Sequence, residues 1–506
     1  MPPSSKKLIL LCMLIFTVSQ AVLIFSSSLL PFQDLPNHLA EAAIYKYSFA
    51  GDSFIKQYYQ LVPWYYPNTF HLLFCNAFSS VELANRFFYV LVIGGLPFSI
   101  YLVISECKGN SWYSLLSILF AYNYNVSYGF SGFSLAIPTI FFLFYVLLKE
   151  IKENRAVWKI AASILLILLF FIHSQMALFG LCLFFFLMIF RYWGNYKTIF
   201  NRLLLTLPLI GFVLIWWFSR AKTKEESTLV FLWNYYKSSY FQTFLLRFRI
   251  VFFDNFQLRE GQAGLLIASL LFLCILLPLV IQKAWKSITR PMVFSKEFLY
   301  PGLFFLISLG CYLFLPDHLP GQQIIYQRFS PILVLSLIIL GSILIKDQQA
   351  KWQKYFSVGL CCIYSFLWME YIYSFNKENR SMNPGFYNGI DRQSVIGGLI
   401  YDNNFRGRPL YIHFPSYFIV WKKGIATSKI IDYRFGVVRR GIKGNEIPYY
   451  EEWPEEKDKI PTDYSGLDYL LVKGEASAKP DSNLFNFYLF RKEGSWQIFK
   501  NKKTKL

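Results

Sequence analysis

Long apolar segments recur along most of this chain, and they constrain its fold more than any other feature. A helix needs about 20 apolar residues to cross the hydrocarbon core of a membrane. We find about eleven segments of that kind before residue 375. They are 8–30, 84–105, 112–129, 133–149, 157–173, 175–191, 198–218, 262–282, 298–315, 329–345 and 355–374. Charged residues make up only 16% of the 506 residues, which excludes an ordinary soluble enzyme. The sequence predicts an all-α polytopic membrane protein.

Basic residues predict the orientation of these helices, because cytoplasmic loops carry an excess of Lys and Arg. Lys6 and Lys7 precede the first segment and place the N-terminus in the cytoplasm. Every loop that the count assigns to the cytoplasm then holds basic residues, among them Lys108, Lys149, Arg191, Lys283 and Lys346. The loops 31–83, 219–261 and 316–328 and the tail face outward. Because cytoplasmic loops account for part of the net charge of +20, we expect no nucleic-acid partner.

The hydrophilic tail is the one soluble part that the sequence predicts. We therefore divide the chain into a transmembrane domain, 1–374, which includes the first outer loop 31–83, and an extracytoplasmic domain, 375–506. Short β-rich runs separated by turn residues favour an α/β or mostly β tail. These runs are Leu410–Phe414, Tyr417–Trp421, Tyr469–Val472, Phe487–Arg491 and Trp496–Phe499. None of the eight cysteines follows residue 362, so the tail has no disulfide.

The first outer loop places polar residues directly after the first apolar segment. Pro36 suits the first turn of a helix over 35–49. On that helix His38 and Glu41 share one face, and Asp34 begins it. This puts two carboxylates and an imidazole near the depth of lipid headgroups. An equally good interpretation is structural, because Asp is a favoured N-cap residue.

Four further polar residues lie where outer loops meet the membrane. His71 lies in an apolar stretch, 68–80, that is too short to span and fits a helix in the interface; a histidine there is more often an interface anchor than a ligand. His173 and Gln175 separate two closely spaced helices, where polar residues either bind ligands or join helices. Arg328 stands at the start of another helix. Its guanidinium suits a phosphate, although an Arg there also snorkels to the interface.

The order of these features resembles the GT-C superfamily of integral-membrane glycosyltransferases, which take sugars from polyprenyl-phosphate donors. The acidic motif of the first outer loop is matched by Gln33-Asp34-Leu35-Pro36-Asn37-His38. The approach to the next helix is matched by Tyr66-Pro67 and Ala84-Asn85-Arg86. The turns Tyr128-Gly129-Phe130 and His173-Ser174-Gln175 are similar to membrane-proximal turns of such proteins. The resemblance covers roughly residues 1–374, and the tail shows no family motif.

This resemblance implies an enzyme of the cell envelope, located in the bacterial inner membrane with its tail in the periplasm. Asp34 would be the general base, and His38, Glu41, His71, His173, Gln175 and Arg328 would bind the substrates. The partners would be a polyprenyl-phosphate sugar donor and a lipid, glycan or protein hydroxyl. Many members carry two adjacent acids, whereas Gln33 and Leu35 flank Asp34 here. We therefore assign no metal ligands, and a divalent metal ion stays an open alternative.

A protein that is not an enzyme is the alternative interpretation. A transporter, flippase or assembly component for lipid-linked glycans could hold a phosphate with the same Arg and His residues. Against a coupled transporter, few acidic residues lie inside the apolar segments, whereas such proteins need buried ionisable groups. The sequence also has no glycine-rich nucleotide-binding motif.

Overall fold

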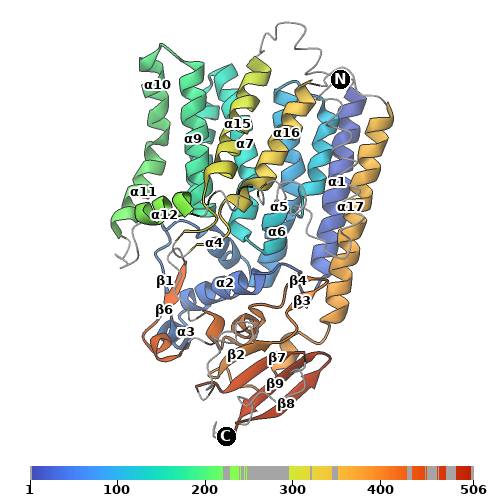
Figure 1. Ribbon diagram of the computed structural model, residues 1–506, viewed down its shortest axis with the longest axis vertical. Coiled ribbons are helices and arrows are strands. Elements are labelled where there is room, and N and C mark those ends of the chain that lie inside the picture. The colour runs from blue at the N-terminus through green and yellow to red at the C-terminus, as the bar shows by residue number, and fades with distance from the viewer. Residues whose placement is uncertain are drawn as a thin grey trace.

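The computed structural model describes the chain in several stretches. They are 3–219, 228–238, 240, 244, 247, 296–319, 322–344, 351–429, 436–448, 450, 452, 464, 466–474 and 486–502. The predicted segment 262–282 lies outside the described residues. Helices form a bundle, and a region with strands covers one of its ends (Figure 1).

Seven helical segments of the described residues are long and apolar enough to cross a membrane, and two shorter apolar helices accompany them. The elements are α1 (Pro3–Ser26), α5 (Val81–Glu106), α7 (Ser131–Glu153), α8 (Ala156–Ile172), α9 (Ser174–Arg191), α10 (Tyr196–Leu203) continued by α11 (Leu207–Ser219), α15 (Lys296–Phe314), α16 (Ser330–Leu344) and α17 (Lys351–Glu378). A short helix, α12 (Thr228–Ser238), follows α11. The chain is an integral membrane protein, because these helices expose apolar side chains such as Ile15, Ile164 and Phe366 on the outside of the bundle.

The segment 112–129 departs from the predicted single α-helix. It forms a buried 3₁₀-helix, η1 (Ser111–Phe120), and a short helix, α6 (Tyr124–Tyr128). The backbone N–H of Asn110 donates to the carbonyl of Ser342, at the far end of α16, over 2.9 Å. The side-chain amide of Asn125 donates to the carbonyl of Arg328, just before α16 begins, also over 2.9 Å. The segment therefore runs beside α16 from one end to the other.

Two serine side chains make hydrogen bonds that are compatible with the tighter helix. The hydroxyls of Ser114 and Ser117 each donate to the carbonyl three residues earlier, over 2.6 Å. That repeat of three matches a 3₁₀-helix, which rises about 2.0 Å per residue rather than 1.5 Å. Because of the longer rise, the ten residues of η1 extend over about 20 Å along α16.

The first outer loop forms the layer between the bundle and the C-terminal region. The predicted helix over 35–49 is present as α2 (Leu35–Phe49), which lies across the end of the bundle (Figure 1). After it come α3 (Ser53–Tyr58), β1 (Tyr59–Leu61) and α4 (Phe70–Asn76). The last of these is the short helix predicted within 68–80.

A five-stranded mixed sheet is the core of the C-terminal region, which we define as residues 379–502. Its order is β5 (Ile425–Ala426), β2 (Val395–Ile400), β7 (Tyr469–Lys473), β9 (Trp496–Asn501) and β8 (Phe487–Glu493). Strand β2 is parallel to both of its neighbours, and β9 is antiparallel to both of its own. A small hairpin, β3 (Asn404–Phe405) and β4 (Arg408–Pro409), lies next to α17. Three of the predicted β-rich runs are therefore strands: β7, β8 and β9.

Two of the five predicted strands are wrong. Residues 410–414 form turns that end in a 3₁₀ turn, η6 (Phe414–Ser416), and 417–421 belong to a helix, α18 (Tyr417–Lys422). The rings of Tyr417 and Trp421 stack with centroids 4.6 Å apart, which is the i, i+4 contact of a helix. Packing of α18 against α2 outweighs the strand preference of this aromatic and β-branched run.

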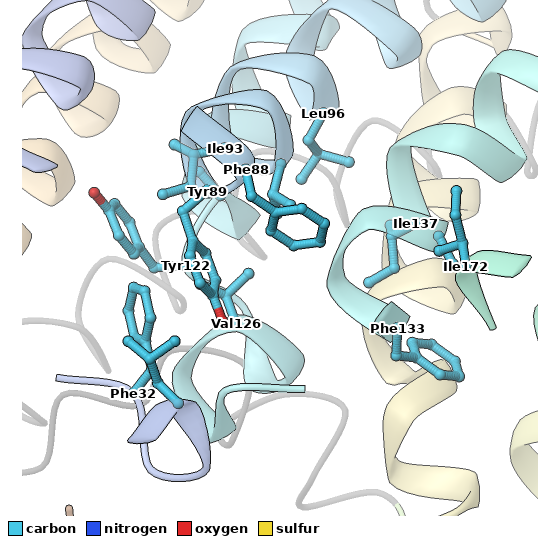
Figure 2. Packing of buried hydrophobic residues seen from close by; sticks show 14 of the residues in the cluster. Phe32, Phe88, Tyr89, Ile93, Leu96, Tyr122, Val126, Phe133, Ile137 and Ile172 are labelled. Atoms are coloured by element: carbon cyan, nitrogen blue, oxygen red, sulfur yellow. The ribbon is translucent and has the colours of Figure 1, made fainter. Parts of the chain in front are cut away.

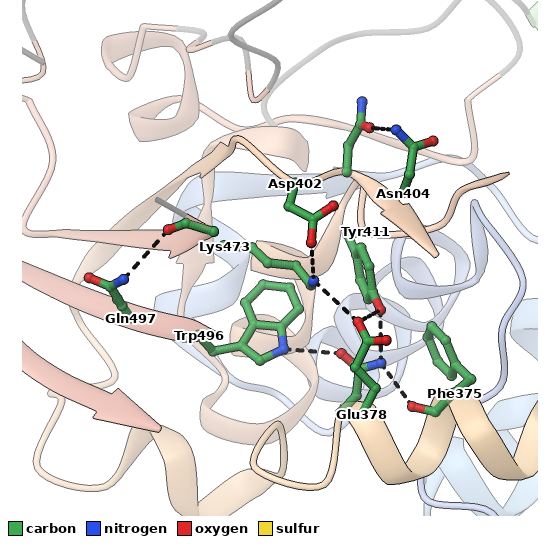
Figure 3. Close-up of polar contacts among 11 residues, drawn as sticks. Phe375, Glu378, Asp402, Asn404, Tyr411, Lys473, Trp496 and Gln497 are labelled. Atoms are coloured by element: carbon green, nitrogen blue, oxygen red, sulfur yellow. Dashed lines mark hydrogen bonds and ion pairs between the residues drawn. The ribbon is translucent and has the colours of Figure 1, made fainter. Parts of the chain in front are cut away.

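A strand pair and a polar cluster are among the contacts that join the C-terminal region to the rest of the chain. Strand β1 of the outer loop pairs antiparallel with β6 (Val438–Arg440). At the end of α17, the buried ammonium of Lys473 lies 3.1 Å from Asp402 and 3.4 Å from Glu378, over the ring of Tyr411 (Figure 3). The Tyr411 hydroxyl donates to Glu378 over 2.5 Å. These residues, with Asn379 and Trp496, are called the Lys473 cluster below.

Candidate active site

Asp34 is held in place by the neighbouring turn at residues 127–129. The backbone N–H of Asp34 donates to the carbonyl of Tyr128 over 3.0 Å, and that of Gln33 to Ser127 over 3.3 Å. Gly129 has φ +79°, and a Cβ there would lie 2.9 Å from the Asp34 nitrogen. Only glycine permits both the conformation and the approach.

An aromatic layer supports the same loop from the bundle side. Phe32, two residues before Asp34, is buried against Tyr89 of α5, with ring centroids 4.7 Å apart, and against Tyr122 at 6.3 Å (Figure 2). The backbone before Asp34 is therefore anchored on both sides, by hydrogen bonds and by packing.

The Asp34 carboxylate does not cap α2, although the residue occupies the N-cap position. Within the described part of the chain, no group makes a hydrogen bond to it. The side chain is half-buried. Burial raises the pKa of Asp34 to about 6, while the charges of His38 and Arg328 act in the opposite direction. A carboxylate with such a pKa and open lone pairs suits a general base.

One face of α2 presents a chain of polar contacts beside Asp34. His38 Nδ1 lies 3.0 Å from one Glu41 oxygen, and the ammonium of Lys429 lies 2.9 Å from the other. Burial disfavours the charge of Glu41, but the charge of Lys429 and the hydrogen bond from His38 outweigh it, so the pKa of Glu41 is lowered. Glu41 is thus an ionised partner of Lys429, as the predicted shared face allows.

Arg328 and His173 meet on the bundle side of Asp34. Arg328 Nη1 lies 3.5 Å from His173 Nε2, and Nη2 donates to the carbonyl of Gln323 over 3.1 Å. Its guanidinium stacks on the ring of Phe130 at 4.1 Å. No Asp or Glu of the described residues forms an ion pair with Arg328, and its Nε is buried without a hydrogen-bond partner.

His173 is neutral beside this cation. Burial and the charge of Arg328 hold the pKa of His173 well below its usual range. Its Nδ1 is buried with no hydrogen-bond partner. The start of α7 lies close to the backbone just before His173. Gly132 permits this close contact, because a Cβ there would lie 2.6 Å from the carbonyl of Ile172.

His71 and Gln175 stand at the edges of this group. His71 Nε2 lies 3.1 Å from the Asn85 amide oxygen, and its ring lies 6.3 Å from that of His38. Burial lowers the pKa of His71 to about 4, so the residue is a neutral support behind His38. The Gln175 amide donates to Gln322 over 3.1 Å and ties α9 to the loop before Arg328.

The C-terminal region adds groups that the sequence did not point to. Lys429 is almost fully buried in η7 (Thr427–Lys429), and His413 precedes η6. Buried Arg408 donates to the Ser127 carbonyl over 2.7 Å, and its Nη1 has no hydrogen-bond partner. These residues lie far from the bundle's polar groups in the sequence. No local sequence pattern marks them, and their left-handed or buried conformations are visible only in the structure. We call the central group the Asp34 cluster: Asp34, His38, Glu41, His173, Arg328, His413 and Lys429.

Side chains that bind metals do not gather in the stretches that the structure describes. There, no group of three or more His, Cys, Asp or Glu side chains is arranged to hold a metal ion. The oxygens of Glu41, the second acid near Asp34, are already engaged by His38 and Lys429. We therefore derive no step that uses a metal.

Comparison with solved structures finds the same fold in a membrane protein that binds a polyprenyl lipid. ArnT from Cupriavidus metallidurans, solved with bound undecaprenyl phosphate, superposes with a TM-score of 0.52 and 11% sequence identity. The match covers 100% of this chain and 99% of ArnT. It confirms the GT-C-like fold, including the C-terminal region. No protein-family model and no curated protein matches the sequence.

Proposed function

We propose that this protein is a glycosyltransferase that moves a sugar from a polyprenyl-phosphate donor to an acceptor hydroxyl, with inversion at the anomeric carbon. One observation carries the proposal above all: the free carboxylate of Asp34 lies within electrostatic reach of Arg328, which has no ion-pair partner among the described residues. Attack by a hydroxyl and departure of a phosphate require a base and an unpaired cation near each other. The GT-C-like fold shared with ArnT supports the donor class.

The reaction is a direct displacement. The carboxylate of Asp34 accepts the proton of the acceptor hydroxyl as the oxygen forms its bond to the anomeric carbon. The bond from that carbon to the phosphate oxygen breaks on the opposite face, and polyprenyl phosphate leaves with the electron pair. Attack from the face opposite the leaving group inverts the configuration.

Arg328 stabilises the charge that develops on the leaving phosphate. A guanidinium held in a low-dielectric environment is worth more to an anion than one in water. Stacking on Phe130 and the hydrogen bond to Gln323 hold the guanidinium in one orientation. His173 is neutral, so it offers a hydrogen bond and adds no second charge.

We place the protein in the bacterial inner membrane, with the N-terminus in the cytoplasm and the active site outside. The N-terminus and the C-terminal region lie at opposite ends of the bundle (Figure 1), which agrees with that arrangement. A domain boundary between 374 and 375 falls in the last turn of α17. The two proposed domains then meet at the Asp34 cluster, where Lys429 of one pairs with Glu41 of the other.

The test compares purified wild type with Asp34→Asn, using undecaprenyl-phosphate sugars as donors. We expect transfer to fall about 10²- to 10⁴-fold, the usual contribution of a general base, with binding of undecaprenyl phosphate retained. Asp52→Asn is the matched control, because Asp52 caps α3 outside the cluster; its transfer rate should equal that of wild type.

Two results would contradict this proposal. Transfer at the normal rate by Asp34→Asn would remove Asp34 as the base. Absence of transfer from every polyprenyl donor, together with lipid movement across liposomes that contain the protein, would favour the transporter or flippase.

A further inference from the structure

Histidine is scarce in this chain, and it is concentrated at one place. Of the five histidines in the sequence, four lie in or beside the Asp34 cluster, on separate elements. His38 is on α2, His71 on α4, His173 before α9 and His413 before η6. The charge of His38 acts on each of the other three. The fifth, His318, packs against Phe231 and Tyr235, outside the cluster.

The two cations of the Asp34 cluster differ in whether they are neutralised. Arg328, on the bundle side, has no ion-pair partner among the described residues. Lys429, on the side of the C-terminal region, is paired with Glu41. That side also holds the buried carboxylate of Glu452, which accepts the backbone N–H of His413 over 2.7 Å. An anion would therefore find a free charge at Arg328, whereas on the side of His413 the cations Lys429 and Arg408 are offset by the carboxylates of Glu41 and Glu452.

His413 has its imidazole open for a ligand. The residue has φ +64° and ψ +10°, a left-handed conformation that is strained for a non-glycine residue. Its side chain is 23% exposed; Nδ1 is buried 3.9 Å from a carboxylate oxygen of Glu452, and no described residue makes a hydrogen bond to Nε2. Burial and the charge of Lys429 lower the pKa of His413 to about 3. The ring is neutral, and Nε2 is left to exchange one hydrogen bond with a hydroxyl group.

His38 offers a second open edge on the same side. Its Nδ1 is engaged by Glu41, its side chain is 30% exposed, and Nε2 has no hydrogen-bond partner in the described stretches. Because η6 packs against α2, His413 and His38 face a common region next to Asp34. Backbone strain held by its surroundings is frequent at binding sites.

We propose that His413 and His38, with the Glu41–Lys429 pair behind them, form the subsite for an uncharged, hydroxyl-bearing acceptor. The C-terminal region then binds the acceptor, the bundle binds the lipid phosphate, and Asp34 lies between the two. This inference rests on the proposed function and extends it to the chemical class of the acceptor. A phosphate-bearing acceptor is disfavoured, because the carboxylates of Glu41 and Glu452 offset the charges of Lys429 and Arg408 on this side.

Nuclear magnetic resonance of the histidine rings tests this directly. The full chain, labelled with ¹⁵N at its five histidines and placed in lipid nanodiscs, gives few enough ring signals to assign by single variants. We expect methyl glucoside to shift the signals of His413 and His38 and to leave that of His318 unchanged. Undecaprenyl phosphate should shift His173 instead.

The variant His413→Asn removes the imidazole and keeps the backbone, because Asn tolerates the left-handed region. We expect it to weaken methyl glucoside binding about tenfold, equivalent to one hydrogen bond, and to leave undecaprenyl phosphate binding unchanged. In the transfer assay it should raise the acceptor KM with a smaller change in kcat. His318→Asn is the matched control and should match wild type in both measurements.

Three results would overturn the inference. One is tighter binding of glucose 6-phosphate than of methyl glucoside at the His413 signal. Another is a loss of undecaprenyl phosphate affinity in His413→Asn as large as the loss for the glucoside. The third is the absence of any shift at His413 with neutral glycosides. All three leave the role of Asp34 untouched, so they differ from a failure of the proposed function.

Discussion

Two polar clusters lie where the helix bundle meets the C-terminal region, and they differ in how far their groups are satisfied. In the Lys473 cluster the buried ammonium lies between two carboxylates and over a ring. The Tyr411 hydroxyl, the Asn379 amide and the Trp496 indole N–H are also hydrogen-bonded there (Figure 3). In the Asp34 cluster the carboxylate of Asp34, the rings of His173 and His413, and Nε of Arg328 all retain open positions among the described residues.

The contrast separates a structural junction from a candidate site. A buried polar group without a partner costs about 1–3 kcal/mol. Several such groups in one place are therefore expected where a ligand supplies the missing hydrogen bonds. The Lys473 cluster joins α17 to β7 and β9 and leaves nothing for a ligand. The backbone at Asp34 is also held by hydrogen bonds, but the side chains of the Asp34 cluster present donors and acceptors without partners among the described residues.

The largest difference should appear in stability. Lys473→Met keeps the volume of the side chain and leaves Glu378 and Asp402 without their shared cation. We expect a loss of about 3 kcal/mol, because the variant removes two charge-assisted contacts with carboxylates and the contact of the ammonium with the Tyr411 ring. Thermal or denaturant unfolding in detergent measures it.

The control for this variant is Lys377→Met, which removes an exposed cation from α17, next to Glu378. A loss for Lys473→Met no larger than for the control would mean that the Lys473 cluster does not hold the two regions together.

A smaller effect on stability, coupled to a loss of transfer, should follow Gly129→Ala. Its Cβ would meet the backbone nitrogens of Leu35 and Asp34 at 2.8 and 2.9 Å, at φ +79°. We expect a loss of about 2 kcal/mol, from strain in a left-handed residue and from displaced backbone, and a greater than tenfold fall in transfer.

Gly51→Ala provides the matched control for Gly129→Ala. Gly51 has φ +88°, and nothing lies within 4 Å of the position that a Cβ would take there. It carries the conformational strain without the approach to Asp34, so transfer should stay at the wild-type rate. Equal loss of transfer in both variants would show that strain alone, and not the position of Asp34, matters.

The smallest effect is the dependence of transfer on pH. Burial raises the pKa of Asp34 to about 6, and the base acts only when deprotonated. Transfer should therefore rise with pH through about 6 and fall about tenfold per unit below it. Steady-state rates between pH 5 and 8 measure the profile. A rate that stays constant from pH 8 to 5 would contradict the assignment of Asp34 as the base.

The same raised pKa has a consequence for stability with the opposite sign to that of a salt-bridged acid. The folded state holds the Asp34 proton more tightly than the unfolded chain does, so this group's contribution to stability decreases as pH rises from about 4 to about 6. At neutral pH the ionised carboxylate of Asp34 lowers the free energy of unfolding. Such a destabilising contribution is consistent with a catalytic role for this group.

Local sequence patterns sufficed for much of the bundle and for part of the cluster. Hydropathy located the long helices, and Pro36 with the spacing of His38 and Glu41 predicted α2 and its polar face. The 3₁₀ crossing at 111–120 was missed, because hydropathy measures apolar length and does not distinguish helix types. Strands were misassigned at 410–414 and 417–421, where the burial of α18 against α2 overrode local preference.

Several polar groups owe their surroundings to contacts between distant segments. Lys429 lies 388 positions after Glu41 in the chain, and no local pattern indicates such a pair. The N-cap interpretation of Asp34 was equally reasonable from the sequence. In the structure the Asp34 carboxylate makes no capping hydrogen bond to α2, and the backbone N–H of Asp34 donates to the carbonyl of Tyr128.

By itself the sequence determined that this chain crosses a membrane many times and carries few ionisable groups near its outer surface, because apolar length and charge are local properties. Tertiary structure alone decided which of those groups meet, which are neutralised and which stay open. Lys473 and Lys429 both acquire carboxylate partners, whereas Arg328 acquires none among the described residues. Burial and pairing depend on neighbours brought together by folding, and those neighbours come from the first outer loop, the bundle and the C-terminal region at once.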